Sequence, residues 1–510
     1  MKRLKPTELE VMKHAFTAIP EQMGAALQRS AYSPNIKERK DESCALFTAE
    51  REMIAQAEHI PVHLGAMPNA LESAVSNHKL SDREQIILND PYSGGTHLPD
   101  ITVIKPVFMQ EKLVGYTVNR AHHSDVGGIT PGSMPGNSKS LDEEGIVIPP
   151  TILIEDGSIN QGVMEKFRRS RSPRERMGDI RAQIGANEKG AEELKKTVKK
   201  YGMEKYIAFK ERVIEYSERR TRKMIESLPE GYVSHEDFME WKNDVKLQVQ
   251  IEIEGDSLKF DFSGTDDQVE GNINAPKPVT FSAVYYVLRC LLPDDIPVNE
   301  GCYRPLNIEI PEGTVLNPES PAAVSAGNVE TSQRVVELIL RALEDIFPEK
   351  IPAESQGTMN NLLIGSDDFT YYETIGGGSG GSYEGPGESG VHVHMTNTKN
   401  TPVEVIENEY PLRVTSYTLR KDSGGDGKMP GGDGIIREIE MLKKAEVSIQ
   451  SERRKIPPKG FMGGGDGKTG RNLKITPEGK TELGSKTTIE LDKGESIRIK
   501  TPGGGGYGKP

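Results

Sequence analysis

The stretches NDPYSGGTHLPD at residues 89–100 and AHHSDVGG at residues 121–128 decide how the first part of this chain folds. An apolar run at residues 101–108 and an alternating run at residues 113–118 lie between them, which predicts a hairpin or strand pair carrying one ligand group at each end. The proline of HLPD excludes the interior of a regular helix, so His97 and Asp100 lie in a loop that can fold both side chains onto one centre.

Histidines concentrate in this region. Six of the 10 histidines fall between residues 59 and 123, namely His59, His63, His78, His97, His122 and His123. Imidazole together with carboxylate suits a borderline divalent metal such as Zn, Mn or Fe. His59 and His63 are candidate ligands or substrate contacts, and they are equally candidates for core histidines. The residues alone leave open whether such a site activates water, polarises a carbonyl or stabilises an enolate.

Composition excludes several classes of protein. The net charge of −13 argues against a nucleic-acid-binding surface. Three cysteines at unrelated spacings predict no disulfide framework and no CxxC site, so we expect a reducing cytoplasm. The N-terminus lacks the apolar core of a signal peptide. No apolar run approaches the roughly 18 residues of a membrane span, so we expect no membrane partner.

The patterns along the chain predict a mixed α+β protein of several units. A charged helical pattern at residues 172–227 indicates long helices, and alternation at 247–262 indicates a β-hairpin. We expect an N-terminal α/β metal-binding unit at residues 1–164, a helical insertion at 165–230, an α/β middle unit at 231–370 and a Gly-rich β unit at 371–510.

Glycine dominates the end of the chain. The last 140 residues hold 28 of the 53 glycines, and alternating segments interrupt the glycine clusters. We therefore expect glycine to supply positive-φ turns and close backbone packing in a β-rich unit. The cluster GGGDGKT departs from the phosphate-loop spacing, so no nucleotide site is predicted in this chain. His392 and His394 share one face if they lie in a strand, either as contributors to the metal or substrate site or as partly buried strand histidines.

Several long motifs resemble one known family. NDPYSGGTHLPDITVIKPVF, NRAHHSDVGGITPGSMPG, HMTNTKNTPVEVIENEYPLRV and the closing TPGGGGYG are similar to the hydantoinase B/5-oxoprolinase family, and the resemblance covers nearly the whole chain. The family also includes larger subunits of acetone and acetophenone carboxylases. The length of this chain is closer to the hydantoinase B type.

The resemblance implies a divided reaction. A partner subunit of the hydantoinase A type binds ATP and activates a lactam or ketone oxygen by phosphorylation, and the B-type subunit completes the chemistry at a divalent metal (Mn, Zn or Fe). For a small cyclic amide, water opens the activated ring. This implies a stable hetero-oligomer, since an activated intermediate must be shielded from bulk water.

The resemblance also implies a set of site residues. The metal ligands are expected at Asp41, His97, Asp100 and His122, with His123 as the alternate for the last position. Asp125 is expected to orient an imidazole. The candidates to handle protons are His59, His63, His123 and Glu144.

Two other functions fit the same chain. The first is a subunit of an ATP-dependent ketone carboxylase, which would demand bicarbonate. The second is a noncatalytic scaffold whose Gly-rich part binds partner subunits and whose histidines are structural.

Overall fold

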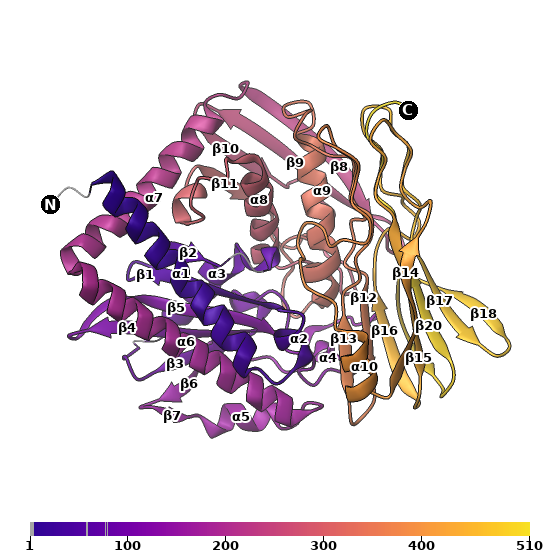
Figure 1. Ribbon diagram of the computed structural model, residues 1–510, viewed down its shortest axis with the longest axis horizontal. Helices are drawn as coiled ribbons and strands as arrows, with labels where there is room; N and C mark the ends of the chain where they lie inside the picture. Colours follow the sequence, from indigo (N-terminus) through magenta and orange to yellow (C-terminus); the bar gives the residue numbers. More distant parts are fainter. Residues whose placement is uncertain (1–4, 58–59, 77, 79) are drawn as a thin grey trace.

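A computed structural model of the protein describes residues 5–57, 60–76, 78 and 80–510. It has the mixed α+β architecture that the sequence predicts, with several separate sheets. In Figure 1 the indigo and magenta N-terminal part lies on one side of the molecule, and the yellow C-terminal strands lie on the other.

The N-terminal sheet has seven strands in the order β2-β1-β5-β4-β3-β6-β7. The strands are β1 (Glu42–Thr48), β2 (Met53–Gln56), β3 (Gln85–Leu88), β4 (Asp100–Met109), β5 (Lys112–His122), β6 (Thr151–Glu155) and β7 (Ser158–Ile159). The predicted strand pair is confirmed as β4 and β5, which pair antiparallel with Asp100 opposite His122. Because the hairpin folds back on itself, the residues before and after it meet at one end.

Helices cover this sheet. The helices of the N-terminal part are α1 (Pro6–Ser30), α2 (Pro34–Lys37), α3 (Ala66–Ser76), α4 (Leu141–Glu144), α5 (Gln161–Phe167), α6 (Pro173–Tyr201) and α7 (Met203–Ile225). Long α6 and α7 confirm the predicted helical stretch, and α6 packs on α1, β4 and β5. In Figure 1 α1 and α6 cross in front of the sheet. Of the helices described, none is both long and apolar enough to cross a membrane.

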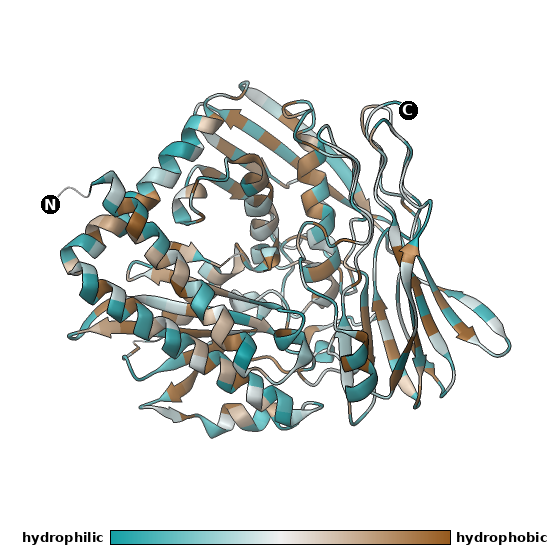
Figure 2. Ribbon diagram, viewed as in Figure 1, coloured by the Kyte–Doolittle hydropathy of each residue, from teal (hydrophilic) through white to brown (hydrophobic). Residues whose placement is uncertain are grey.

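The second sheet has the order β11-β10-β9-β8. Its strands are β8 (Gly231–Met239), β9 (Val245–Glu254), β10 (Ser257–Asp261) and β11 (Leu306–Glu309). The predicted hairpin is confirmed as β9 and β10, and burial alternates along β9. Hydropathy alternates along the same strand in Figure 2. Helices α8 (Lys277–Leu291) and α9 (Ser332–Ala342) pack on each other, and α9 packs on β8 and β9.

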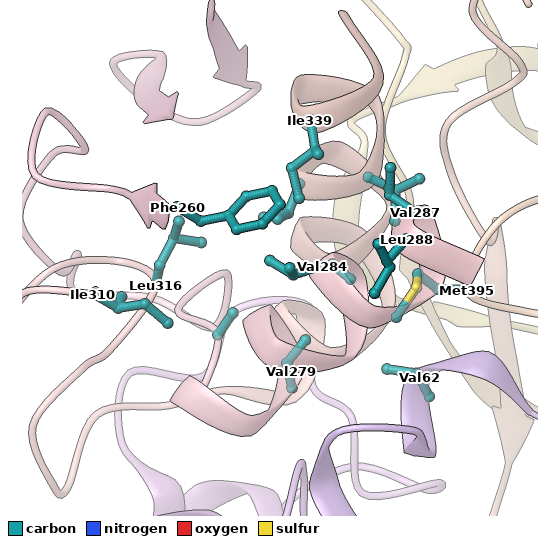
Figure 3. Close-up of a cluster of buried hydrophobic side chains, with 14 of the residues drawn as sticks. Val62, Phe260, Val279, Val284, Val287, Leu288, Ile310, Leu316, Ile339 and Met395 are labelled. Carbon is teal, nitrogen blue, oxygen red and sulfur yellow. The ribbon is translucent and has the colours of Figure 1, made fainter. Parts of the chain in front are cut away.

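The largest hydrophobic core lies around α8 and α9. Figure 3 shows Val284 and Leu288 of α8 in one cluster with Phe260 of β10 and Ile339 of α9. Val62 and Met395 lie at one end of the same cluster. The core thus extends to residues that, as described below, also line the candidate site.

The C-terminal part forms two more sheets. One has the order β13-β12-β16-β19, with β12 (Asn361–Gly365), β13 (Thr370–Glu373), β16 (Ala445–Gln450) and β19 (Lys486–Leu491). The other has the order β14-β15-β20-β17-β18, with β14 (Leu412–Arg420), β15 (Gly434–Met441), β17 (Arg471–Thr476), β18 (Gly479–Leu483) and β20 (Ser496–Lys500). Short α10 (Val403–Glu409) packs on β14. The Gly-rich part is therefore β-rich, whereas the predicted unit boundaries stay a prediction.

The glycine clusters pack against one another. The Gly504 N–H donates to the Gly432 carbonyl at 3.0 Å, and the Gly425 N–H donates to the Gly504 carbonyl at 2.8 Å. A Cβ on Gly504 would lie 1.9 Å from the Ser379 carbonyl oxygen, and one on Gly432 would lie 1.9 Å from the Glu388 carbonyl oxygen. Three segments far apart in the chain thus approach too closely for any side chain. Close backbone packing explains these glycines.

Replacing Gly504 by alanine tests this packing. We expect Gly504→Ala to lower the free energy of unfolding by about 1–3 kcal/mol, because the added methyl group overpacks a backbone contact. Gly385→Ala is the matched control in a neighbouring segment, since a Cβ there meets nothing within 4 Å. We expect a change within about 0.5 kcal/mol for this control. Urea unfolding of the two variants measures both, and equal stabilities would contradict the packing argument.

Candidate metal centre

The loop before β4 is folded by its own polar side chains. The Asn89 amide donates to the carbonyls of Leu98 and Ile146 at 2.8 and 2.9 Å, and its oxygen accepts from the Ile148 N–H at 2.7 Å. The Asp90 carboxylate accepts from the Tyr92 N–H at 3.0 Å. Gly94 then adopts a φ of +92°, which favours glycine. These contacts return the chain to the sheet and deliver HLPD to the start of β4.

Asp100 is the centre of a buried group. Its Oδ1 lies 3.1 Å from His97 Nε2 and 3.2 Å from His122 Nδ1. The two imidazole nitrogens are 3.2 Å apart. The ligand atoms of these three residues all lie within 4.8 Å of one another. The structure thus brings together three of the four predicted metal ligands.

The other carboxylate oxygen of Asp100 is held by the surrounding protein. Oδ2 accepts from Thr96 Oγ1 at 2.6 Å and from Asn328 Nδ2 at 3.4 Å, and it lies 3.3 Å from His63 Nε2. Burial opposes ionisation of Asp100, but the charges of His97 and His63 and the nearby hydrogen bonds hold its pKa well below the ordinary value. Asp100 is therefore an anion that keeps one oxygen directed at the two imidazoles.

These residues fit a divalent metal ion. His122 Nε2 is buried and has no hydrogen-bond partner among the described residues, although Tyr372 of β13 stacks on the ring with centroids 4.6 Å apart. Burial lowers the pKa of His122, which favours the neutral ring that binds metals. A cavity of about 20 Å³ lies beside it, lined among others by Asp41, His63, Asp100 and Asn328. Such a volume holds roughly one water or ion.

Asp41 lies beside the group of three. Its carbonyl oxygen accepts from the His122 N–H at 3.0 Å, and its side chain lines the same cavity. The structure therefore places Asp41 next to the three converging residues while leaving its role as a ligand a prediction.

His123 faces the opposite way from His122. Its Nε2 lies 3.0 Å from the Gln183 side-chain oxygen on α6, and burial lowers its pKa to about 4. Neighbouring residues at a strand end point to opposite faces, which explains the separation. His59, the other candidate near the loop, lies outside the described residues.

Glu144 supports the chain behind His97. Its carboxylate accepts from Ser138 Oγ at 2.8 Å and from the N–H groups of Val324 and Ser325 at 3.0 Å each. The Ser325 carbonyl oxygen in turn lies 3.5 Å from His97 Nδ1. Burial raises the pKa of Glu144. Its contacts with the protein are thus structural, and its role in proton transfer stays a prediction.

Among the described residues, Asp125 contacts backbone N–H groups and an arginine rather than an imidazole, contrary to the expectation. Its carboxylate accepts from the N–H groups of Gly127, Gly132 and Arg171 at 3.0 Å each and pairs with the Arg171 guanidinium at 3.2 Å. These bonds fix the loop after β5.

His392 and His394 lie outside the group of three. His394 Nε2 is 2.7 Å from Glu337 Oε1 on α9. Both ring nitrogens of His392 are buried without a hydrogen-bond partner among the described residues, and burial lowers its pKa to about 4. Both side chains are therefore partly buried histidines outside the metal centre.

Two further residues at the centre, Asn328 and Tyr372, are not predicted from the sequence. Asn328 lies in a π-helical turn, η4 (Gly327–Thr331), directly before α9. Its position depends on Gly327, where a Cβ would lie 1.9 Å from the Asn274 carbonyl oxygen. The small-residue segment SAGN before the helix is a weak signal for such a turn. Tyr372 has no signal in its local sequence.

The chain is similar to known proteins over its whole length. A family model described as Hydantoinase B/oxoprolinase matches residues 5–510. The 5-oxoprolinase of Dictyostelium discoideum is 42% identical over 519 residues, which cover 99% of this chain but only 40% of that protein. A putative D-/L-hydantoinase subunit of the B type from Pseudomonas sp. (strain NS671) is 31% identical over 541 residues, covering 100% of this chain and 91% of the relative. The crystal structure of the ATP-dependent caprolactamase from Pseudomonas jessenii has a TM-score of 0.94 at 27% identity, covering 100% of this chain and 92% of the other.

Elemental analysis tests the centre. We expect about one equivalent of Mn, Zn or Fe in the purified protein, and less than about a tenth of that in His97→Gln and Asp100→Asn, because each variant removes a converging ligand atom. His235→Gln, on β8 of the second sheet, is the matched control and should keep the metal. Equal metal content in all of these proteins, or none in any, would contradict the ligand set.

Proposed function

Because this chain belongs to the hydantoinase B/oxoprolinase family, we propose that it is the metal-dependent subunit of an ATP-dependent cyclic amide hydrolase. The observation that carries the proposal is the convergence of His97, Asp100 and His122 within 4.8 Å at a buried centre. Three protein ligands with one position left open are typical of catalytic metal sites.

The substrate class comes from the relatives. The names of three relatives, a caprolactamase, a 5-oxoprolinase and a hydantoinase, each refer to a cyclic amide. All three names therefore support a small lactam or hydantoin as the substrate of this chain.

We assign ATP binding to a partner chain of the hydantoinase A type. The chain spans only 40% of the 5-oxoprolinase of Dictyostelium discoideum, and one relative is named as a single subunit of a hydantoinase. Within the described part of the chain, GGGDGKT lies in a turn and an irregular segment followed by β17, without the helix that a phosphate loop requires. Both observations support a hetero-oligomer, which we place in the cytoplasm because Cys44, Cys290 and Cys302 are free thiols.

The residues around the centre have distinct tasks in this proposal. A divalent metal, when bound, supplies Lewis acidity toward water and toward the activated amide. Asp100 holds its negative charge in the buried site and orients both imidazoles. His63, whose Nδ1 lies 2.9 Å from Ser43 Oγ, fixes the second oxygen of Asp100. Tyr372 holds the plane of the His122 ring by stacking.

Asn328 is the candidate to hold a water molecule beside the metal centre. Its Nδ2 donates to Asp100, whereas its Oδ1 is buried without a donor among the described residues. A water molecule in the cavity of about 20 Å³ that Asn328 lines would satisfy this oxygen. Burial of the surrounding groups keeps bulk water from the activated ring.

Reconstitution tests the proposal. We test an A-type partner chain with ATP and 5-oxoproline or another lactam. We expect one water to add to the ring carbon while the ring C–N bond breaks and the nitrogen takes up a proton. A second water releases phosphate from the activated oxygen, so the products are an open-chain amino acid, ADP and phosphate. Asp100→Asn should lower this rate at least about 100-fold, because the metal is lost. His235→Gln should keep it. Product analysis by mass spectrometry measures both.

Two results would contradict the proposal. A carboxylated product formed only with bicarbonate would favour a role in a ketone carboxylase. Full activity of the metal-free complex would favour a scaffold whose histidines are structural.

A further inference from the structure

A second and larger cavity lies beside the metal centre. It has a volume of about 270 Å³ and is lined, among other described residues, by Ile60, Pro61, Leu64, Tyr286, Arg289 and Asn397. We refer to it as the side chamber. We propose that the side chamber binds a small anionic cyclic amide, with Arg289 as the partner of the anion and Gln56 as the acceptor for the ring N–H. This inference rests on the proposed function.

Two short segments separate the side chamber from the metal centre. The first runs through the 3₁₀ turn η1 (Pro61–His63), where Ile60 lines both cavities, Pro61 lines the chamber, and Val62 and His63 line the metal cavity. The second contributes Met395 and Thr396 to the metal cavity and Asn397 to the chamber. Consecutive residues thus face the two cavities, so the partition is about one side chain thick.

Of the two cavities, only the side chamber approaches the size that a small ring needs. The metal cavity of about 20 Å³ has no room for an organic ring. The chamber of about 270 Å³ approaches the size of small-molecule sites, which begin at roughly 300 Å³. A small ring in the chamber lies next to the metal centre, and Ile60 stands between them.

The lining of the chamber fits a small ring. Ala57, Ile60, Pro61, Leu64 and Val298 supply apolar surface, and Tyr286 supplies an aromatic side chain. Only a few polar groups interrupt this lining. This combination is typical of sites in which apolar contacts hold the ligand and a few polar groups orient it.

Gln56 supplies an unused acceptor. It lies at the end of β2, is only 6% exposed, and lines the chamber. Its Oε1 is buried and has no hydrogen-bond donor among the described residues. An unpaired buried acceptor is unfavourable, and the N–H of a lactam or hydantoin is the donor that would pair with it.

Arg289 supplies a positive charge that is not paired with a carboxylate among the described residues. Its Nη1 donates to the Ile296 carbonyl at 3.3 Å, and among the described residues it forms no ion pair with a carboxylate. It lines the chamber and also an outer cavity of about 530 Å³, with which the chamber shares Gln56, Ala57 and Val298. Besides Arg289, the outer cavity carries Lys13 and three acidic residues, Glu21, Asp294 and Asp295, so any preference for an anion depends on Arg289. A guanidinium binds a ring carboxylate or a phosphoryl group through paired hydrogen bonds.

Cys290 allows the chamber to be probed without turnover. It lines the chamber and is the exposed one of the three free thiols, whereas Cys44 and Cys302 are buried. Alkylation of Cys290 by N-ethylmaleimide, followed by intact mass, therefore reports whether the chamber is occupied. The assay uses the full-length metal-loaded chain and needs neither ATP nor the partner. A failure of ring opening in the complex is thus distinguishable from a failure of this inference.

Three probes distinguish the source of the anion. 5-Oxoproline carries a ring carboxylate, 2-pyrrolidinone has the same ring without charge, and inorganic phosphate supplies the anion alone. We expect 5-oxoproline to slow alkylation of Cys290 at concentrations about tenfold below those at which 2-pyrrolidinone does so. If the anion is instead a phosphoryl group, phosphate and 2-pyrrolidinone together protect better than either alone.

Variants identify the residues. Arg289→Gln should abolish the advantage of the anionic probe, and Gln56→Met should weaken protection by both lactams equally. Arg219→Gln, in a separate groove on α7, is the matched control. In this variant each probe should slow alkylation of Cys290 as much as it does in the wild type. Metal content equal to wild type shows that each variant is folded. The inference is overturned if no probe slows alkylation, or if the anionic advantage survives in Arg289→Gln.

Discussion

The arrangement of the metal centre depends on the register of the hairpin formed by β4 and β5. Because β4 pairs antiparallel with β5 and Asp100 stands opposite His122, two groups of residues 25 positions apart meet at one end of the sheet. A slip of one residue would turn His122 away and bring His123 to the centre, since successive side chains of a strand face opposite sides. The register in turn is maintained by the buried apolar residues of both strands and by α6, which packs across them.

The centre also depends on the C-terminal half of the chain. Tyr372 stacks on His122, and Met359, Met395 and Thr396 line the metal cavity. Val62 and Met395 belong at the same time to the largest core, so the wall of the cavity is continuous with the packing of α8 and α9. A buried anion such as Asp100 is tolerated because every side of its carboxylate is met by a donor or an imidazole. Val62 and Met395 therefore contribute both to the wall of the metal cavity and to the packing of the core.

Elements that depend on neighbouring residues were predictable from the sequence, whereas contacts between segments far apart in the chain were not. Periodicity predicts β4 and β5, α6 and α7, and the β9–β10 hairpin, because each depends on neighbours in sequence. The residues of HLPD and HHSD indicate one group of candidate ligands, and the choice of His122 over His123 follows from the family resemblance. Asn328 and Tyr372 reach the centre only through tertiary packing, 228 and 250 residues from Asp100 and His122 respectively. The glycine clusters are visible in the sequence, but the contact of Gly504 with Gly432 has no local signature.

The most direct measurement is anomalous diffraction from crystals of the metal-loaded protein, collected at the absorption edge of the metal that it contains. Our account predicts a single strong peak within coordination distance of His97 Nε2, Asp100 Oδ1 and His122, with the Asp41 carboxylate beside it. A peak elsewhere, for example between His392 and His394, or the absence of any peak in protein that retains activity, would contradict it.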